Sequence, residues 1–138
     1  VLFRSSHTGI LFKRWSILPF PALIDYFKLN FMYLYVKDLQ PKSFRISNYW
    51  TLNQDRNIPY ALRTHSDFAI PFSRLALTTR LPFISLPKTW NKYGEILKDL
   101  KNKPNFILFK KHLKKTLIEN IETNCNRLLC HICHLNAI

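Results

Sequence analysis

The chain has 138 residues and a mass of 16.5 kDa, and 47% of its residues are hydrophobic, so one packed domain is the most it can form. Its 21 Lys and Arg residues outnumber 8 Asp and Glu, which gives a formal net charge of +13. The two glycines, Gly9 and Gly94, are far apart, so the sequence contains no glycine-rich loop for nucleotide phosphates. Enzymes that bind nucleotides through such a loop are therefore excluded, and the hydrophobic content argues against disorder of the whole chain.

Targeting signals and cysteine usage suggest where the protein resides. The sequence begins at Val1 without a secretory signal, and we interpret it as part of a longer protein. The longest apolar tract, residues 15–36, contains Asp25 and Lys28, and each central charge costs about 2.5–3.5 kcal/mol on insertion, so no transmembrane span is expected. All three cysteines lie near the end of the chain, which argues against a secreted disulfide framework. We expect an intracellular protein, in the nucleus or the cytoplasm.

The fold is expected to be mainly α with short irregular or extended segments, and an α+β arrangement remains open. A first amphipathic helix is predicted over residues 21–38, because Pro21 suits a first helical turn and Gln40-Pro41 ends the pattern. Its apolar residues recur at spacings of three and four, and we expect this stripe to be core. The stripe comprises Leu23, Ile24, Phe27, Phe31, Leu34 and Tyr35.

Residues 41–92 contain five prolines, at intervals too short for a long helix. Short extended pieces are predicted instead, over residues 74–79 and 83–86. Arginines alternate here with aromatic residues, and this combination can hold phosphates and stack on bases. The alternative is that the aromatic residues form the core and the arginines are solvated. The arginines favoured for binding are Arg63, Arg74 and Arg80.

A second amphipathic helix is predicted over residues 104–121, where helical periodicity returns. Its apolar face comprises Phe106, Phe109, Leu113, Leu117 and Ile121, and its basic face comprises Lys110, Lys111, Lys114 and Lys115. Such a face can follow a phosphate backbone or lie on an anionic membrane, or it can be a solvated surface of a packed helix. Charge alone does not choose among RNA, DNA and lipid.

No active site is recognisable, because the eight carboxylates form no metal-binding pattern and the glycines of a nucleophile elbow are absent. The one cluster with ligand chemistry lies in the tail, residues 122–138, which follows a single domain over residues 1–121. Cys125, Cys130, Cys133 and His134 offer three thiolates and an imidazole for a tetrahedral zinc ion. The alternative is that these are free thiols, since all the ligands fall within a few residues of one another.

An ordered series of short motifs resembles the region downstream of the polymerase domain in non-LTR (LINE-type, jockey-like) retrotransposon reverse transcriptases. The series covers about residues 6–120 and departs from the family pattern at Leu86 and at Lys92-Tyr93. Its motifs are Ser6-His7-Thr8, Leu11-Phe12-Lys13, Ile17-Leu18, Phe31-Met32-Tyr33, Tyr60, Arg63-Thr64, Ile70-Pro71, Arg74, Pro87-Lys88-Thr89-Trp90-Asn91, Phe109-Lys110 and Leu113-Lys114.

The resemblance implies that the parent protein is an RNA-directed DNA polymerase and that this chain, which lacks the paired catalytic aspartates, is a non-catalytic appendage of it. Its partners would be RNA or DNA and the remainder of the polymerase. The four lysines of residues 110–115, then Arg63, Arg74 and Arg80, would contact phosphates, which position nucleic acid without reading sequence. Trp90 is expected to pack in the core rather than to stack on a base. A membrane-surface module and a protein-interaction module remain as alternatives.

Overall fold

The computed structural model describes residues 8–41, 49–56, 66–101 and 105–121, and within these ranges the protein is mainly helical, as predicted. The only β pairing in these ranges is an isolated antiparallel bridge between Leu52 and Phe68. The helices are α1 (Thr8–Arg14), α2 (Phe20–Val36), α4 (Pro82–Lys92), α5 (Lys98–Lys101) and α6 (Phe106–Glu119), with the 3-10 helices η1 (Asn53–Asp55) and η2 (Thr78–Arg80).

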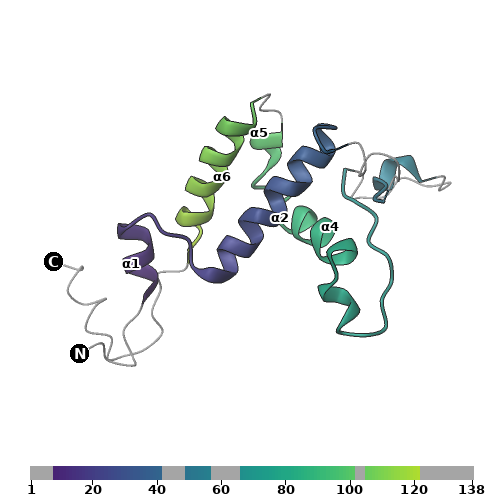
Figure 1. Ribbon diagram of the computed structural model, residues 1–138, viewed down its shortest axis with the longest axis horizontal. Helices are drawn as coiled ribbons and strands as arrows, with labels where there is room; N and C mark the ends of the chain where they lie inside the picture. The colour runs from purple at the N-terminus through teal and green to yellow at the C-terminus, as the bar shows by residue number, and fades with distance from the viewer. Residues whose placement is uncertain (1–7, 42–48, 57–65, 102–104, 122–138) are drawn as a thin grey trace.

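Helix α2 is the centre of the arrangement (Figure 1). It crosses the molecule diagonally, packs against α4 on one side and against α6 on the other, and α5 lies beside α6. The short helix α1 contacts α6. None of the described helices is long and apolar enough to cross a membrane.

Both predicted amphipathic helices are present, with shorter bounds. Helix α2 ends at Val36, before Gln40-Pro41, because Asp38 adopts a left-handed conformation with φ 54°. The backbone N–H groups of Asp38 and Leu39 then bond to the carbonyls of Tyr35 and Leu34, which closes the helix. At the start of α6, the side chain of Asn105 accepts a hydrogen bond from the N–H of Ile107 at 2.8 Å, so the helix begins with a side-chain cap.

The predicted core stripe of α2 is wrong in its first half. Leu23, Ile24 and Phe27 are exposed, and Phe27 exposes 63% of its surface. The stripe's later members, Phe31, Leu34 and Tyr35, are half-buried and pack against the core. The face that is fully buried against the other helices carries Leu29, Met32 and Tyr33 instead. Because α2 is apolar on both faces, its periodicity identified a helix without identifying the buried side.

Helix α4 replaces the extended segment predicted over residues 83–86. Pro82 occupies its first turn, where no backbone N–H is needed, but Pro87 lies inside the helix and cannot donate to the carbonyl of Phe83. Trp50 donates its indole N–H to that carbonyl at 2.8 Å. An interior proline is thus accommodated by a side chain from another segment. The extended segment predicted over residues 74–79 is also wrong, because these residues form a turn that leads into η2.

Aromatic stacking joins α2 to α6. The ring of Tyr33 stacks on Phe109 with centroids 4.0 Å apart and on Phe106 at 5.9 Å. Burial raises the pKa of the Tyr33 phenol above its ordinary value. Leu113 and Leu117 continue the buried face of α6. The predicted apolar face of this helix is therefore core as far as Leu117, while Ile121 is half-buried.

Side-chain hydrogen bonds fix α4 to its neighbours. Asn91 accepts from the N–H of Phe68 and donates to the carbonyl of Phe68, both at 2.9 Å. The hydroxyl of Tyr93 donates to Asp25 on α2 at 2.8 Å. Trp90, on the same helix, exposes only 2% of its surface, which confirms its predicted place in the core.

Candidate nucleic-acid interface

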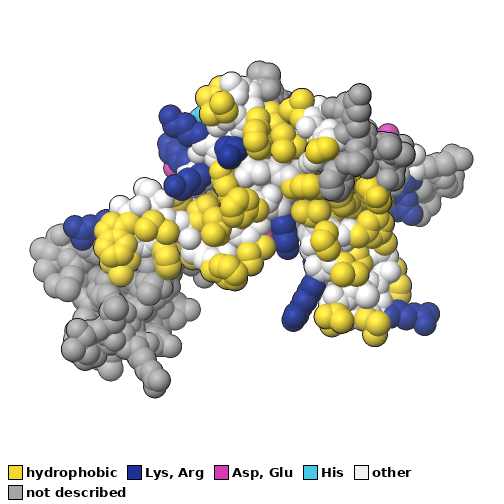
Figure 2. Space-filling model, viewed as in Figure 1, with side chains coloured by type: hydrophobic (Ala, Val, Ile, Leu, Met, Phe, Trp, Pro, Cys, Tyr) yellow, Lys and Arg dark blue, Asp and Glu magenta, His cyan; other side chains and the backbone are white. Residues whose placement is uncertain are grey.

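The basic face of α6 is a continuous exposed surface. Lys110, Lys111, Lys114 and Lys115 are all exposed. At 3.6 residues per turn, Lys111 and Lys115 lie opposite to the buried stripe of the helix, and Lys110 and Lys114 lie beside it. Lys110 and Lys114, like Lys111 and Lys115, are four residues apart and therefore neighbours along the helix. We call these four residues the lysine face. Figure 2 shows Lys and Arg side chains gathered over α6, at the upper left.

The four lysines differ in their local partners. The ammonium of Lys110 lies 5.4 Å from the centre of the Phe106 ring, and that of Lys115 lies 3.8 Å from the carboxylate of Glu119. Lys111 and Lys114 form no ion pair within the part of the chain that the structure describes. These two ammonium groups are therefore the most available to an external anion.

Further cations lie on the helix that contacts α6. Helix α1 contacts α6 and carries Lys13 and Arg14 in its last turn. The sequence predicts no helix over residues 8–14, so it does not connect these two cations with α6. A helical signal was weak there because α1 has only seven residues.

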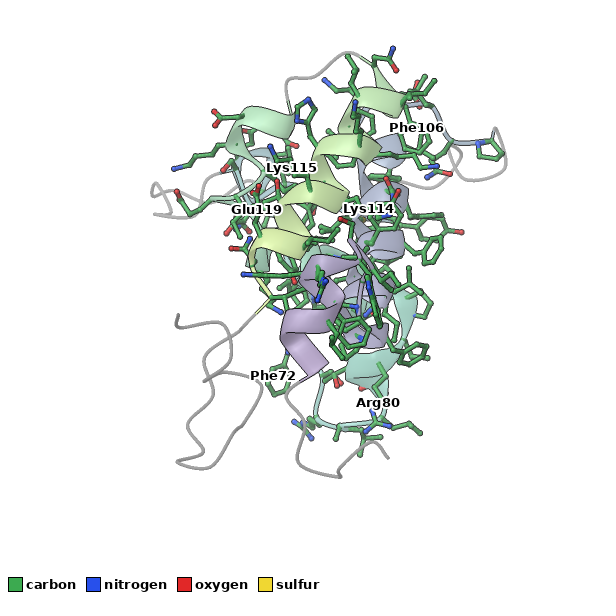
Figure 3. All side chains as sticks on the ribbon, turned by 90° about the vertical axis from the view of Figure 1, so that its left-hand side faces the viewer. Phe72, Arg80, Phe106, Lys114, Lys115 and Glu119 are labelled. Atoms are coloured by element: carbon green, nitrogen blue, oxygen red, sulfur yellow. The ribbon has the colours of Figure 1, made fainter. Side chains whose placement is uncertain are left out.

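The predicted arginines lie apart from the lysine face. Arg80 is at the end of η2, and Figure 3 places it at the bottom of the molecule, whereas Lys114 and Lys115 lie on α6 in the upper half. Arg74 is exposed in the turn that precedes η2. Arg63 lies outside the described residues. The structure therefore gathers the four lysines on one helix and does not bring Arg74 and Arg80 to them.

Comparisons with known proteins add no family assignment. No protein-family model, curated protein or solved structure matches the chain. The lysine face must therefore be interpreted from its own geometry and charge.

The predicted zinc ligands, Cys125, Cys130, Cys133 and His134, also lie outside the described residues, so zinc binding stays a prediction of the sequence. Within residues 8–121, as far as they are described, His, Cys, Asp and Glu side chains form no group of three that could hold a metal ion. What the described surface offers is a row of exposed ammonium groups on a rigid helix. Such a row can hold several phosphates at once.

Proposed function

We propose that the protein is a nucleic-acid-binding, non-catalytic part of a retroelement RNA-directed DNA polymerase, and that it holds RNA or DNA by phosphate contacts. The observation that carries the proposal is the lysine face of α6, four exposed cations on a helix whose other side is fixed in the core. The motif series of the sequence supports the retroelement assignment. A net charge of +13 adds long-range attraction toward any polyanion.

The apolar face of α6 is occupied by the fold. Phe109 is fully buried and Phe106 stacks on Tyr33, so neither side chain is available to enter a lipid bilayer. A helix that lies on a membrane uses its apolar face for insertion, and here that face packs on α2. These contacts favour nucleic acid over a membrane surface as the partner of the lysines.

The exposed first half of α2 supports a place within a larger assembly. Phe20, Ile24 and Phe27 follow one another at helical spacing and are exposed. A helix that is apolar on both faces is typical of the interior of a larger protein. The remainder of the proposed polymerase would cover this face.

The salt dependence of binding tests the lysine face. We would compare the wild type with a Lys111→Gln/Lys114→Gln double variant, using fluorescence anisotropy with a short RNA–DNA duplex over a range of salt. Each phosphate contact contributes about 0.9 to the slope of log affinity against log salt, so the slope should fall by about 2 in the variant. A Lys37→Gln/Lys88→Gln variant removes the same charge from exposed positions on other elements and should retain the wild-type slope.

Each outcome has a definite meaning. An unchanged slope in the α6 variant would remove the lysine face from the interface. An equal fall in both variants would mean that only net charge matters. Tighter binding to anionic vesicles than to nucleic acid in the same buffer would favour the membrane-surface alternative.

A further inference from the structure

A shallow groove of about 420 Å³ opens beside the turn that precedes α4, at the other end of the molecule from the lysine face. Its volume falls within the range of about 300–1,000 Å³ that is usual for small-ligand pockets. Phe72, Arg74 and Phe83 line it, together with apolar groups of Ile84 and the hydroxyl-bearing residues Ser73 and Thr78. The groove thus combines aromatic rings, an apolar floor and one cation.

The two aromatic side chains of the groove differ in how tightly the fold holds them. Phe83 stacks on Trp50, with centroids 6.4 Å apart and planes 29° apart, and its carbonyl is held by the Trp50 indole. Phe72 exposes 87% of its surface. One ring is therefore held as a wall of the groove, while the other can turn onto a bound planar group.

The turn that carries these residues is fixed by its own hydrogen bonds. The hydroxyls of Ser73 and Thr78 hydrogen-bond to each other across the turn. Thr78 also lies 2.7 Å from the carbonyl oxygen of Leu75, to which its hydroxyl donates. Because the hydroxyls are used within the turn, the groove wall is formed before any ligand arrives, which lowers the entropy cost of binding.

The charge around the groove is positive. The sequence has no Asp or Glu between Asp67 and Glu95, whereas Arg74 and Arg80 fall within this stretch. Neither arginine forms an ion pair within the described residues. Figure 2 shows apolar side chains with Lys or Arg at their edges in this region, at the lower right. A ligand that combines a flat apolar group with negative charge would match these aromatic and cationic side chains.

We propose that the groove binds an unpaired nucleobase of single-stranded RNA or DNA, with Phe72 stacking on the base and Arg74 and Arg80 contacting the flanking phosphates. Any of the bases can stack on an aromatic side chain, and guanidinium groups form hydrogen bonds with phosphate oxygens. The inference rests on the proposed function, since it assumes that nucleic acid is the partner, but it assigns a second subsite with different chemistry. The lysine face would hold a backbone, and the groove would select for an unpaired strand.

The test compares single-stranded with double-stranded ligands. With the full chain, anisotropy would measure the affinity for a short unstructured RNA and for a duplex of the same sequence. Phe72→Ala should weaken binding of the single strand by about fivefold or more and leave duplex binding unchanged, because paired bases cannot stack on the ring. Its salt slope should stay at the wild-type value, since no charge is removed. Arg74→Gln should lower the single-strand slope by about 0.7.

Leu77 provides the matched control, because it is a similarly exposed apolar residue of the same turn that does not line the groove. Leu77→Ala should bind both ligands as the wild type does. Unchanged single-strand affinity in Phe72→Ala would overturn the inference, as would equal losses in Phe72→Ala and Leu77→Ala. Shifts of the Phe72 and Phe83 resonances caused by an apolar peptide, with none caused by the RNA, would assign the groove to a protein partner instead.

The same assay separates this inference from the proposed function. The Lys111→Gln/Lys114→Gln variant should lower the salt slope for both ligands and keep the preference that Phe72 provides. If the Lys111→Gln/Lys114→Gln variant kept the wild-type salt slope while Phe72→Ala still weakened single-strand binding, the lysine face would not be part of the interface but the groove would remain a binding site. If only the lysine variant changed binding and Phe72→Ala did not, the groove would not bind a base.

Discussion

Trp50 donates its indole N–H to the carbonyl of Phe83, the carbonyl that Pro87 leaves without its helical partner. The two residues come from different segments, and the bond lets α4 continue through an interior proline. Phe83 also lines the groove beside the preceding turn, so the same bond holds a wall of the proposed base-binding subsite.

A double-mutant cycle tests this relationship. Trp50→Phe keeps an aromatic ring near Tyr35 but leaves the Phe83 carbonyl unpaired, and should lower the free energy of unfolding. Pro87→Ala restores an N–H to the helix, so Trp50→Phe should cost less in that background. We expect a coupling of about 0.5–1.5 kcal/mol from urea unfolding of the four proteins. Additive effects would contradict the assignment of the Trp50 bond as a substitute for the helical one.

The two faces of α2 should respond differently to truncation. Leu29 is fully buried, so Leu29→Ala should cost about 2–5 kcal/mol of unfolding free energy. Phe27 is larger but exposed, and Phe27→Ala should change stability by no more than about 0.5 kcal/mol. Urea unfolding of both variants measures the difference. A cost for Phe27→Ala equal to that for Leu29→Ala would mean that this face is covered in the isolated chain.

These faces show where sequence reasoning succeeds and where it stops. Periodicity identified α2 and α6 as helices, since a repeat near 3.6 residues is a local property of the chain. It chose the correct face of α6, because lysines mark its solvent side. It chose poorly for α2, where apolar residues occur all round and only contacts with α4 and α6 decide which side is buried.

Helix α4 and the groove were beyond the same reasoning for a different reason. Pro82 and Pro87 favour extended structure locally, and the compensating donor, Trp50, lies more than thirty residues earlier in the sequence. The pattern of arginines and aromatic residues predicts phosphate and base contacts, and these contacts stay a prediction. It could not show that Arg74 lines one groove with Phe72 and Phe83, because that arrangement depends on tertiary packing.

The tie between Tyr93 and Asp25 predicts a pH dependence of stability. Burial of the phenol, followed by its hydrogen bond to Asp25 and the charge of that carboxylate, raises the pKa of Tyr93 from 10.0 to about 12. The neutral phenol is therefore favoured in the folded state. Its contribution to stability is fully present below pH 10 and is lost as the pH rises through about 12.

Comparison with Tyr93→Phe isolates this contribution from the titration of lysines. At pH 7 the variant should be less stable by about 1 kcal/mol, because one partly exposed hydrogen bond to a carboxylate is lost. Lys92, whose ammonium lies 3.6 Å from Asp25, remains in the variant as a partner for the carboxylate. The difference between the two proteins should shrink between pH 10 and 12, as measured by urea unfolding at each pH. A constant difference over this interval would show that Tyr93 is not held neutral by the fold.

Asn91 belongs to the Pro87–Asn91 motif on which the resemblance to reverse transcriptases partly rests. In the structure it joins two segments of the chain. Its side chain pairs with both backbone groups of the buried Phe68 and joins that segment to α4. Asn91→Ala should lower the free energy of unfolding by about 2–3 kcal/mol, because a backbone donor and a backbone acceptor lose their partners together. It should also remove protection of the Phe68 amide in hydrogen exchange.

Lys88→Ala, at an exposed position of the same helix, is the control and should change stability by no more than about 0.5 kcal/mol. If the motif serves packing, Asn91→Ala measured at a temperature where the variant remains folded should leave the salt slope for nucleic acid unchanged. A lower slope in folded Asn91→Ala would instead connect the motif with the interface. Equal stability of the Asn91 and Lys88 variants would mean that the pairing with Phe68 does not hold the segment in place.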